Sequence, residues 1–192
     1  MIVYIHGFNS SPQSLKARLL RARFAVHGRA DEFVAPALPV SPRAAAALLR
    51  GIVSEQPTAT LIGSSLGGFY VTWLAERLTL RAVLINPAVR PYESLDGHIG
   101  RQKNYHTGEE YDFTAQHVAE LRALEVEVIT PERYLLLIGT ADEVLDYRDA
   151  VAHYRGCHQI VVAGGNHSLD SFDDYLDAVI AFCDADSPLA RV

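Results

Sequence analysis

Short apolar runs recur along the chain, and most of them are continuous rather than alternating with polar residues. A short continuous run is typical of a strand that is covered on both faces. The runs therefore predict a buried sheet of about six strands, at Ile2–Ile5, Glu32–Ala35, Ala59–Ile62, Ala82–Ile85, Tyr134–Ile138 and Gln159–Val162.

Two of the segments between these runs begin with a helix-start signal. In Ser11-Pro12 and in Ser41-Pro42 a capping residue precedes a proline, and proline is favoured at the first position of a helix. We therefore expect helices to begin at Pro12 and at Pro42. Ala44–Leu49 is rich in strong helix formers and supports the second of them.

Three further helices are predicted nearer the C-terminus. One covers residues 66–78 and ends near Thr79, and another covers residues 143–154 and stops at Gly156. The last is amphipathic, with Ser168 as a possible cap. Its apolar residues recur at spacings of three and four, at Leu169, Phe172, Leu176, Val179, Ile180 and Cys183.

The alternation of strands with helices predicts the α/β class. Parallel strands joined by helices form a sheet with helices on both faces, here as a single domain over residues 1–192. Ligands bind such sheets outside the carboxyl ends of the strands. The loops that follow strands are therefore where the chemistry is expected.

Residues 86–132 interrupt this rhythm. They show no clear strand pattern, are polar and contain glycines, and they end in a predicted helix over 115–124 with Thr114 as its N-cap. An insertion of this length inside a compact domain is usually functional or mobile. We interpret residues of about 87–131 as a small cap over the site. The alternative is a surface segment that only covers the sheet.

Composition and charge narrow the class of protein. A chain of 192 residues suits one domain, and 49% hydrophobic with 21% charged residues is ordinary for a globular protein. The 17 Lys and Arg residues against 23 Asp and Glu residues give a net charge of −6, which argues against a nucleic-acid partner. No apolar run approaches the about 18 residues of a membrane span, and no signal-peptide pattern opens the chain. We expect no membrane span and a cytoplasmic location.

The strongest chemical signal is Gly63-Ser64-Ser65-Leu66-Gly67, which fits the pattern G-x-S-x-G. A predicted strand runs into it and a predicted helix leaves it, as a nucleophile elbow requires. Small neighbours are needed because the serine sits on a sharp, crowded turn. The alternative is a phosphate-binding turn. However, the lysine of a P-loop and the glycine spacing of a dinucleotide site are missing, so Ser65 is the candidate nucleophile.

A serine hydroxyl needs a base to become a nucleophile. In folds with this elbow, the partners follow in the order serine, acid, histidine, each after a later strand. Asp142 and His167 occupy these two positions. Glu143 and Asp146 stay open as alternative acids, since either could instead be a charge at a helix N-terminus. His167 taken alone could be a surface residue.

Two backbone N–H groups are needed to stabilise the negative oxygen that forms when a carbonyl is attacked. Leu66, the residue after the nucleophile, supplies one of them. The loop His6-Gly7-Phe8 after the first strand supplies the other, and Phe8 is the candidate donor. His6 is expected to organise this loop through hydrogen bonds.

Neither a metal nor an organic cofactor is expected. The histidines of the insertion occur without an H-E-x-x-H motif or a Cys/His cluster. The two cysteines, Cys157 and Cys183, are expected to be packing thiols. The residues that bind the substrate stay unassigned.

Five segments of the chain resemble the α/β-hydrolase superfamily and, more closely, the small bacterial YqiA-type esterases. They are residues 4–12, 63–70, 86–91, 139–147 and 164–168, and the resemblance covers nearly the whole chain. It implies a compact α/β-hydrolase fold that lacks the first strands of the full-size sheet. It also implies hydrolysis of carboxylic esters or thioesters through Ser65, Asp142 and His167. Asn166 stands where many relatives are expected to have an acidic residue.

The expected function is therefore that of a serine esterase, with a small-molecule ester or thioester as substrate. One alternative is an acyl thioesterase, which would use the same three residues. The other is a non-catalytic binding protein of the same fold, because a fold does not fix a function. The oligomeric state is left open between a monomer and a weak homodimer.

Overall fold

Six parallel strands form the central sheet of the computed structural model, which describes residues 1–184. The strand order is β2-β1-β3-β4-β7-β8, and every neighbouring pair is parallel. The predicted sheet is therefore confirmed. Its strands are β1 (Ile2–Ile5), β2 (Phe33–Val34), β3 (Thr60–Ser64), β4 (Arg81–Ile85), β7 (Tyr134–Gly139) and β8 (His158–Val162).

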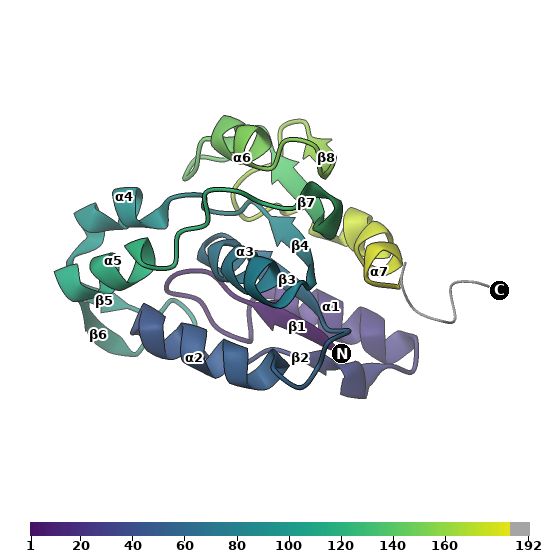
Figure 1. Ribbon diagram of the computed structural model, residues 1–192, viewed down its shortest axis with the longest axis horizontal. Helices are drawn as coiled ribbons and strands as arrows, with labels where there is room; N and C mark the ends of the chain where they lie inside the picture. Colours follow the sequence, from purple (N-terminus) through teal and green to yellow (C-terminus); the bar gives the residue numbers. More distant parts are fainter. Residues whose placement is uncertain (185–192) are drawn as a thin grey trace.

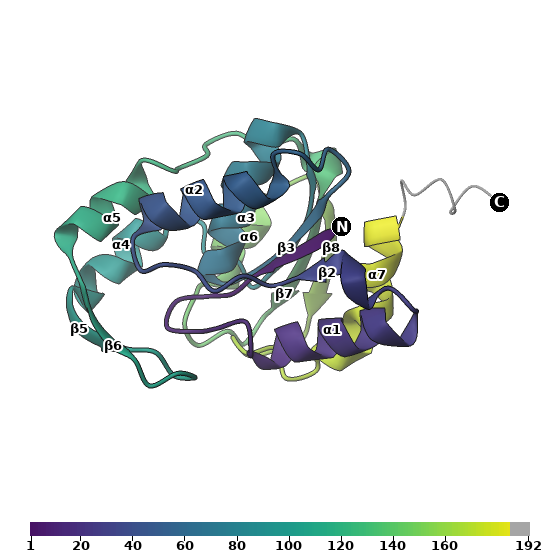
Figure 2. The same cartoon turned by 90° about the horizontal axis from the view of Figure 1, so that it is seen from below.

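Helices cover both faces of this sheet (Figures 1 and 2). They are α1 (Leu15–Val26), α2 (Pro42–Val53), α3 (Leu66–Leu78), α6 (Tyr147–His153) and α7 (Leu176–Asp184). Successive strand residues point to opposite faces. Val3 and Leu61 accordingly belong to the core under α2, α3 and α6, whereas Tyr4 and Ile62 belong to the core under α1 and α7.

The inserted segment contains two short helices and a hairpin, beyond the carboxyl end of β1 (Figure 1). Its elements are α4 (Pro91–Leu95), β5 (Gly100–Lys103), β6 (Glu110–Phe113) and α5 (Ala115–Arg122). The expectation of no strand in this segment was wrong. The two antiparallel strands pair only with each other and are largely exposed, so no apolar run marks them.

Three helix predictions also need correction. The first helix begins at Leu15 and not at Pro12, because the Ser11 hydroxyl accepts the Gln13 N–H at 3.0 Å and forms a turn instead of a cap. The helix predicted from residue 143 begins only at Tyr147. Ser168 caps nothing, since Leu169 follows it at a φ of +47°. The last segment then forms a 3-10 turn (Phe172–Tyr175) before α7.

Other local predictions are confirmed. Ser41 caps α2 by accepting the Ala44 N–H, and α3 covers residues 66–78 and ends at Thr79 in the left-handed region. Thr114 caps α5. Three shorter 3-10 turns complete the order, at Ala30–Glu32, Asp96–His98 and Pro131–Arg133. Over residues 1–184, no helix is both long and apolar enough to cross a membrane.

Candidate active site

Ser65 occupies a sharp turn between β3 and α3. Its φ of +53° lies in the left-handed region, which residues with a side chain rarely adopt. Glycines make the turn possible: a Cβ on Gly67 would lie 2.0 Å from the Ile5 carbonyl oxygen, and one on Gly63 would lie 2.5 Å from the Gly67 carbonyl oxygen. The Ser65 N–H donates to the Ile85 carbonyl at 3.0 Å, so the end of β4 fixes the turn.

Three side chains from three loops are hydrogen bonded in series beside this turn. His167 Nε2 lies 3.1 Å from Ser65 Oγ, and His167 Nδ1 lies 2.8 Å from Asp142 Oδ2. A neutral ring nitrogen that faces a carboxylate carries the hydrogen, which leaves a lone pair on Nε2 toward the hydroxyl. The structure thus brings together the three residues that the sequence singled out.

Asp142 is held as a carboxylate in a buried position. Its side chain has an exposed fraction of 0%. Burial alone would raise its pKa, but hydrogen bonds from the His167 ring and from the Leu145 and Val144 N–H groups bring the pKa below its ordinary value. Both N–H groups donate to Oδ1 at 2.8 Å, which leaves Oδ2 for the ring.

The two alternative acids lie elsewhere. Glu143 accepts the backbone N–H of His167 at 3.0 Å and is not hydrogen bonded to the ring. Asp146 caps α6 by accepting the Arg148 N–H at 3.0 Å, and it also pairs with the Arg148 guanidinium. Of the three carboxylates, only that of Asp142 is hydrogen bonded to the imidazole.

Asn86, to which the sequence analysis assigned no role, joins the two loops that carry Asp142 and His167. Its fully buried side chain follows β4. Oδ1 accepts the Gly139 N–H at 2.8 Å, and Nδ2 donates to the carbonyls of Asn166 and His167 at 2.9 Å each. One amide therefore fixes the start of one loop and the centre of the other. The signals in the sequence are an asparagine directly after a buried run and its place in the family-like segment 86–91, neither of which indicates a positioning role.

Lys16 of α1 holds the histidine loop from the opposite side. Its Nζ donates to the Ser168 carbonyl at 2.5 Å. Burial lowers the pKa of Lys16 to about 8, against the opposing influence of Asp170 and Asp142. The two neighbours of His167 are therefore bonded to different parts of the fold: Asn166 to Asn86 after β4, and Ser168 to Lys16 of α1.

The loop after β1 lies directly against Ser65. A Cβ on Gly7 would lie 3.1 Å from Ser65 Cβ and 3.6 Å from Ser65 Oγ, so only glycine permits this approach without a shift. His6 Nδ1 donates to the Gly7 carbonyl at 3.0 Å, and burial lowers the pKa of His6. Leu66 is the first residue of α3, where the N–H has no acceptor within the helix.

The hairpin of the insertion is hydrogen bonded to this same loop. The Tyr111 hydroxyl donates to Asn9 Oδ1, and Asn9 Nδ2 donates to Gln102 Oε1 at 3.1 Å. Asn104 Nδ2 donates to the Ser10 carbonyl at 2.8 Å. The insertion therefore borders the candidate site, although its role as a cap stays a prediction.

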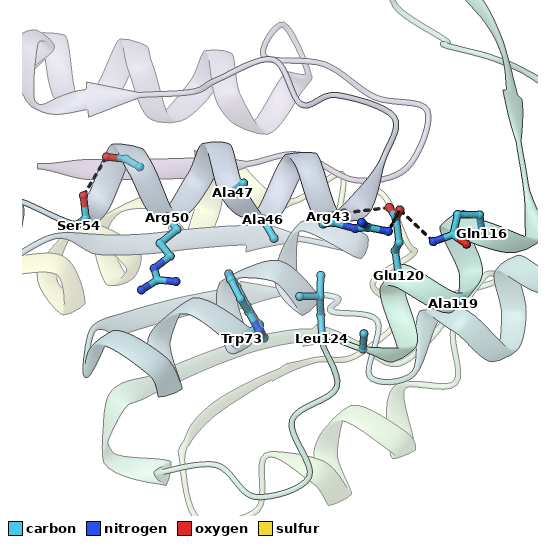
Figure 3. A pocket seen from close by; sticks show the side chains of 12 residues that line it. Arg43, Ala46, Ala47, Arg50, Ser54, Trp73, Gln116, Ala119, Glu120 and Leu124 are labelled. Atoms are coloured by element: carbon cyan, nitrogen blue, oxygen red, sulfur yellow. Dashed lines mark hydrogen bonds and ion pairs between the residues drawn. The ribbon is translucent and has the colours of Figure 1, made fainter.

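Two cavities border α5. A small one of about 70 Å³ lies between the loop after β1, the start of α3 and the insertion, where Phe8 and Leu66 contribute to its wall. A groove of about 730 Å³ lies between α2 and α5, over Trp73 of α3 (Figure 3). None of Ser65, Asp142 and His167 lines the groove.

The chemistry available at Ser65 follows from these contacts. A hydroxyl beside an imidazole whose second nitrogen faces a buried carboxylate is the arrangement that activates serine as a nucleophile. Within residues 1–184, no group of three His, Cys, Asp or Glu side chains is placed to hold a metal ion.

The chain is similar to solved hydrolase structures along nearly its whole length. A putative hydrolase from Agrobacterium vitis S4 matches with a TM-score of 0.72 and 18% identity, over 95% of this chain and 87% of that chain. The monoacylglycerol lipase of Paleococcus ferrophilus matches with a TM-score of 0.68 and 15% identity, over 96% and 93%. The chain therefore has the α/β-hydrolase fold, with lipases and esterases among its structural neighbours.

Sequence relatives extend over the same length. The UPF0227 protein YcfP of Salmonella paratyphi A is 24% identical over 194 residues, which cover 95% of this chain and 98% of the relative. The model of the family described as "Uncharacterised protein family (UPF0227)" matches residues 1–184, and the chain belongs to that family.

Proposed function

We propose that the protein is a serine hydrolase that cleaves carboxylic esters through a covalent acyl-enzyme. The observation that carries the proposal is the hydrogen-bonded series of Ser65, His167 and Asp142, with 3.1 Å and 2.8 Å between the paired atoms. The positive φ of Ser65 supports it, because the strained turn presents the hydroxyl outside the carboxyl end of β3.

In the first half of the reaction, Ser65 Oγ attacks the ester carbonyl carbon and His167 Nε2 takes the hydroxyl proton. Asp142 stabilises the imidazolium that forms and keeps the ring in the correct orientation. The tetrahedral intermediate then breaks its bond to the alcohol oxygen, which leaves with the proton from His167. The acyl group remains as an ester of Ser65.

In the second half, a water molecule attacks the acyl-enzyme while His167 Nε2 takes one of its protons. The carbonyl–Oγ bond then breaks, and the proton on His167 returns to Ser65 Oγ. The products are one carboxylic acid and one alcohol, and the enzyme is regenerated. We assign the backbone N–H groups of Phe8 and Leu66 to the negative oxygen of both tetrahedral intermediates.

The same groups would attack a thioester. The structure offers no contact that favours one leaving group over the other, so oxyester and thioester are compared in the experiment. A pair of substrates with the same acyl group and different leaving atoms separates an esterase from an acyl thioesterase.

The test is labelling with a fluorophosphonate, followed by peptide mapping, on the wild-type protein and on Ser65→Ala. Only an activated serine reacts quickly with this probe. We expect one labelled residue, Ser65, and no label on the variant. Ser64→Ala is the matched control, because Ser64 precedes Ser65 in the same motif and has no hydrogen bond to His167 among residues 1–184. It should keep the label on Ser65.

A folded wild-type protein that takes no label would refute the proposal and favour a non-catalytic binding protein. A label on Ser64 in the wild-type protein would show that the assignment of Ser65 as the nucleophile is wrong. Ester hydrolysis by Ser65→Ala should fall by about 10⁶-fold in kcat, the order found when a triad serine is removed.

A further inference from the structure

The small cavity of about 70 Å³ has a position that suits one part of a substrate. Gly7 and Leu66, which lie beside Ser65, line it, and so do Phe113 and Leu121 of the insertion. The Phe8 ring, also in the lining, contacts the Phe113 ring edge to face, with 5.2 Å between the ring centroids. His167 does not line it. In ester cleavage, the leaving oxygen must reach His167 Nε2 to receive its proton. The cavity on the other side of Ser65 is thus left for the acyl group.

The cavity also contains a polar group without a partner. Tyr70 of α3 lines it and is only 3% exposed. No residue within 1–184 is hydrogen bonded to the Tyr70 hydroxyl, and burial raises the pKa of Tyr70, so the hydroxyl keeps its proton and can donate as well as accept.

The other buried tyrosines show how unusual this is. Each of them has a hydrogen-bond partner for its hydroxyl: Ser14 for Tyr4, Glu125 for Tyr92, Glu76 for Tyr134 and Thr72 for Tyr154. A buried phenol normally finds such a partner. The Tyr70 oxygen is not among the fully enclosed polar atoms that lack a partner in residues 1–184, so it is accessible from the cavity. Tyr70 is the exception, and it lies one helical turn after Leu66, beside the nucleophile.

The volume limits what can enter. An apolar cavity of about 150 Å³ holds a benzene ring, so a cavity of about 70 Å³ holds roughly half as many atoms. The rest of the lining is mostly apolar, with Leu38, Val40 and Phe113 among its side chains. The site therefore suits a short chain with one polar atom.

We infer that the substrate is an ester of a short acyl group, about three to four carbons long, that carries a hydroxyl or oxo group for Tyr70. This inference rests on the proposed function. Tyr70 is the residue that determines specificity: its hydroxyl donates to, or accepts from, the polar substituent, while Phe8 and Leu66 hold the carbonyl oxygen.

The experiment compares p-nitrophenyl 3-hydroxybutyrate with p-nitrophenyl butyrate, each corrected for its spontaneous hydrolysis. The ratio of kcat/KM for the two esters is measured for the wild type and for Tyr70→Phe. We expect the ratio to fall about tenfold in the variant, the effect of one lost hydrogen bond between neutral groups. Tyr175→Phe, on the opposite face of the sheet, is the control and should keep the wild-type ratio.

The thermal midpoint gives a second readout. Because Tyr70→Phe removes no hydrogen bond within the protein, its Tm should equal or exceed that of the wild type. A Tm lower by more than about 4 °C would mean that the hydroxyl is bonded inside the protein, and it would overturn the inference.

The outcomes separate this inference from the proposed function. An unchanged ratio in Tyr70→Phe refutes the inference and leaves the serine hydrolase intact. A wild-type protein that is labelled by fluorophosphonate but hydrolyses neither ester also refutes the inference and leaves the serine hydrolase intact. A wild-type protein that does not label refutes the proposed function, and the inference falls with it.

Discussion

The two cavities beside α5 differ in size and in the residues that line them. The groove between α2 and α5 has about 730 Å³, and the cavity near Ser65 has about 70 Å³. In the groove, the Glu120 carboxylate accepts hydrogen bonds from the Ser41 hydroxyl, the Arg43 side chain and Gln116, whereas the buried Trp73 Nε1 has no hydrogen-bond partner among residues 1–184. In the small cavity, the Tyr70 hydroxyl has no hydrogen-bond partner among residues 1–184.

Volume alone is a poor guide to a binding site. A binding site needs a few convergent polar groups that are free to meet a ligand. Small residues of α2 and α5, including Ala46, Ala47 and Ala119, line part of the groove (Figure 3). The small cavity is lined by Gly7 and Leu66, the residues that lie directly beside Ser65, although Ser65, Asp142 and His167 do not themselves line it. Variants of both regions test which of the two cavities the substrate occupies.

The largest effect is expected from Asp142→Asn. The amide can donate to His167 Nδ1 and so favour the wrong tautomer, which leaves no lone pair facing Ser65. We expect kcat to fall by about 10³–10⁴-fold while the fold is kept. The measurement is ester hydrolysis at neutral pH, with circular dichroism as the check on folding.

Asp146→Asn is the matched control for this prediction. Asp146 also follows β7, but its carboxylate is bonded to Arg148 and caps α6. Its activity should stay within about twofold of the wild type, since exposed substitutions have small effects. A loss at Asp146 equal to that at Asp142 would contradict the assignment of the acid.

The next effect in size is expected from Asn86→Ala. The change leaves the Gly139 N–H and two carbonyls of the histidine loop without their partner, all in a buried place. We expect kcat to fall by about 10–100-fold with a smaller change in KM, because a small misplacement of catalytic groups is costly. The free energy of unfolding should fall by about 2–3 kcal/mol.

Asn86→Gly separates positioning from backbone strain. Asn86 has a φ of +42°, which glycine adopts freely. The glycine variant thus relieves the strain and still lacks the amide. If its rate of fluorophosphonate labelling equals that of the wild type, Asn86 does not position the loops.

The sheet could be predicted from the sequence because burial on both faces produces continuous apolar runs. The hairpin of the insertion could not, since Arg101, Gln102 and Lys103 are exposed or half-exposed and look like a loop. Helix α6 begins later than predicted because of a local side-chain interaction that the sequence pattern does not show. The carboxylate of Asp142 accepts the Val144 and Leu145 N–H groups and forms a turn where a helix start was predicted.

The positions of Ser65 and His167 were predictable because a motif and a fixed order of strands mark them. The supporting residues were not. Asn86 acts through contacts with Gly139, Asn166 and His167, which lie 53 to 81 residues away in the chain. Tyr70 stands out only because its hydroxyl lacks a partner, and a missing partner leaves no trace in a sequence.

A smaller effect, on stability alone, is expected from Glu120→Gln in the wall of the groove. Glu120 accepts hydrogen bonds from the Ser41 hydroxyl at 2.7 Å and from the Arg43 N–H at 3.1 Å, so it fixes α5 to the start of α2. We expect the free energy of unfolding at pH 7 to fall by about 2 kcal/mol, with little change in kcat. Urea titration measures it.

The difference in free energy of unfolding between the wild type and Glu120→Gln should become smaller as the pH falls. Burial would raise the pKa of Glu120, but hydrogen bonds from Ser41, Arg43 and Gln116 lower it from 4.5 to about 2. A carboxyl whose pKa is lower in the folded state stabilises above its unfolded pKa and loses this effect as the pH falls. The difference between wild type and Glu120→Gln should be complete above pH 5 or so and should shrink between about pH 4.5 and 2.

The smallest effect is expected from filling the groove. Ala47 is exposed on α2 and lines the groove, so Ala47→Gln adds volume there at little cost to the helix. We expect kcat/KM for p-nitrophenyl butyrate to stay within about twofold of the wild type. Val40→Trp, which fills the small cavity instead, is the matched counterpart and should lower the same kcat/KM several-fold, because bulk there excludes the acyl group. A loss at Ala47 that matched or exceeded the loss at Val40 would reverse the comparison, because the substrate would then occupy the larger groove, which lies away from Ser65.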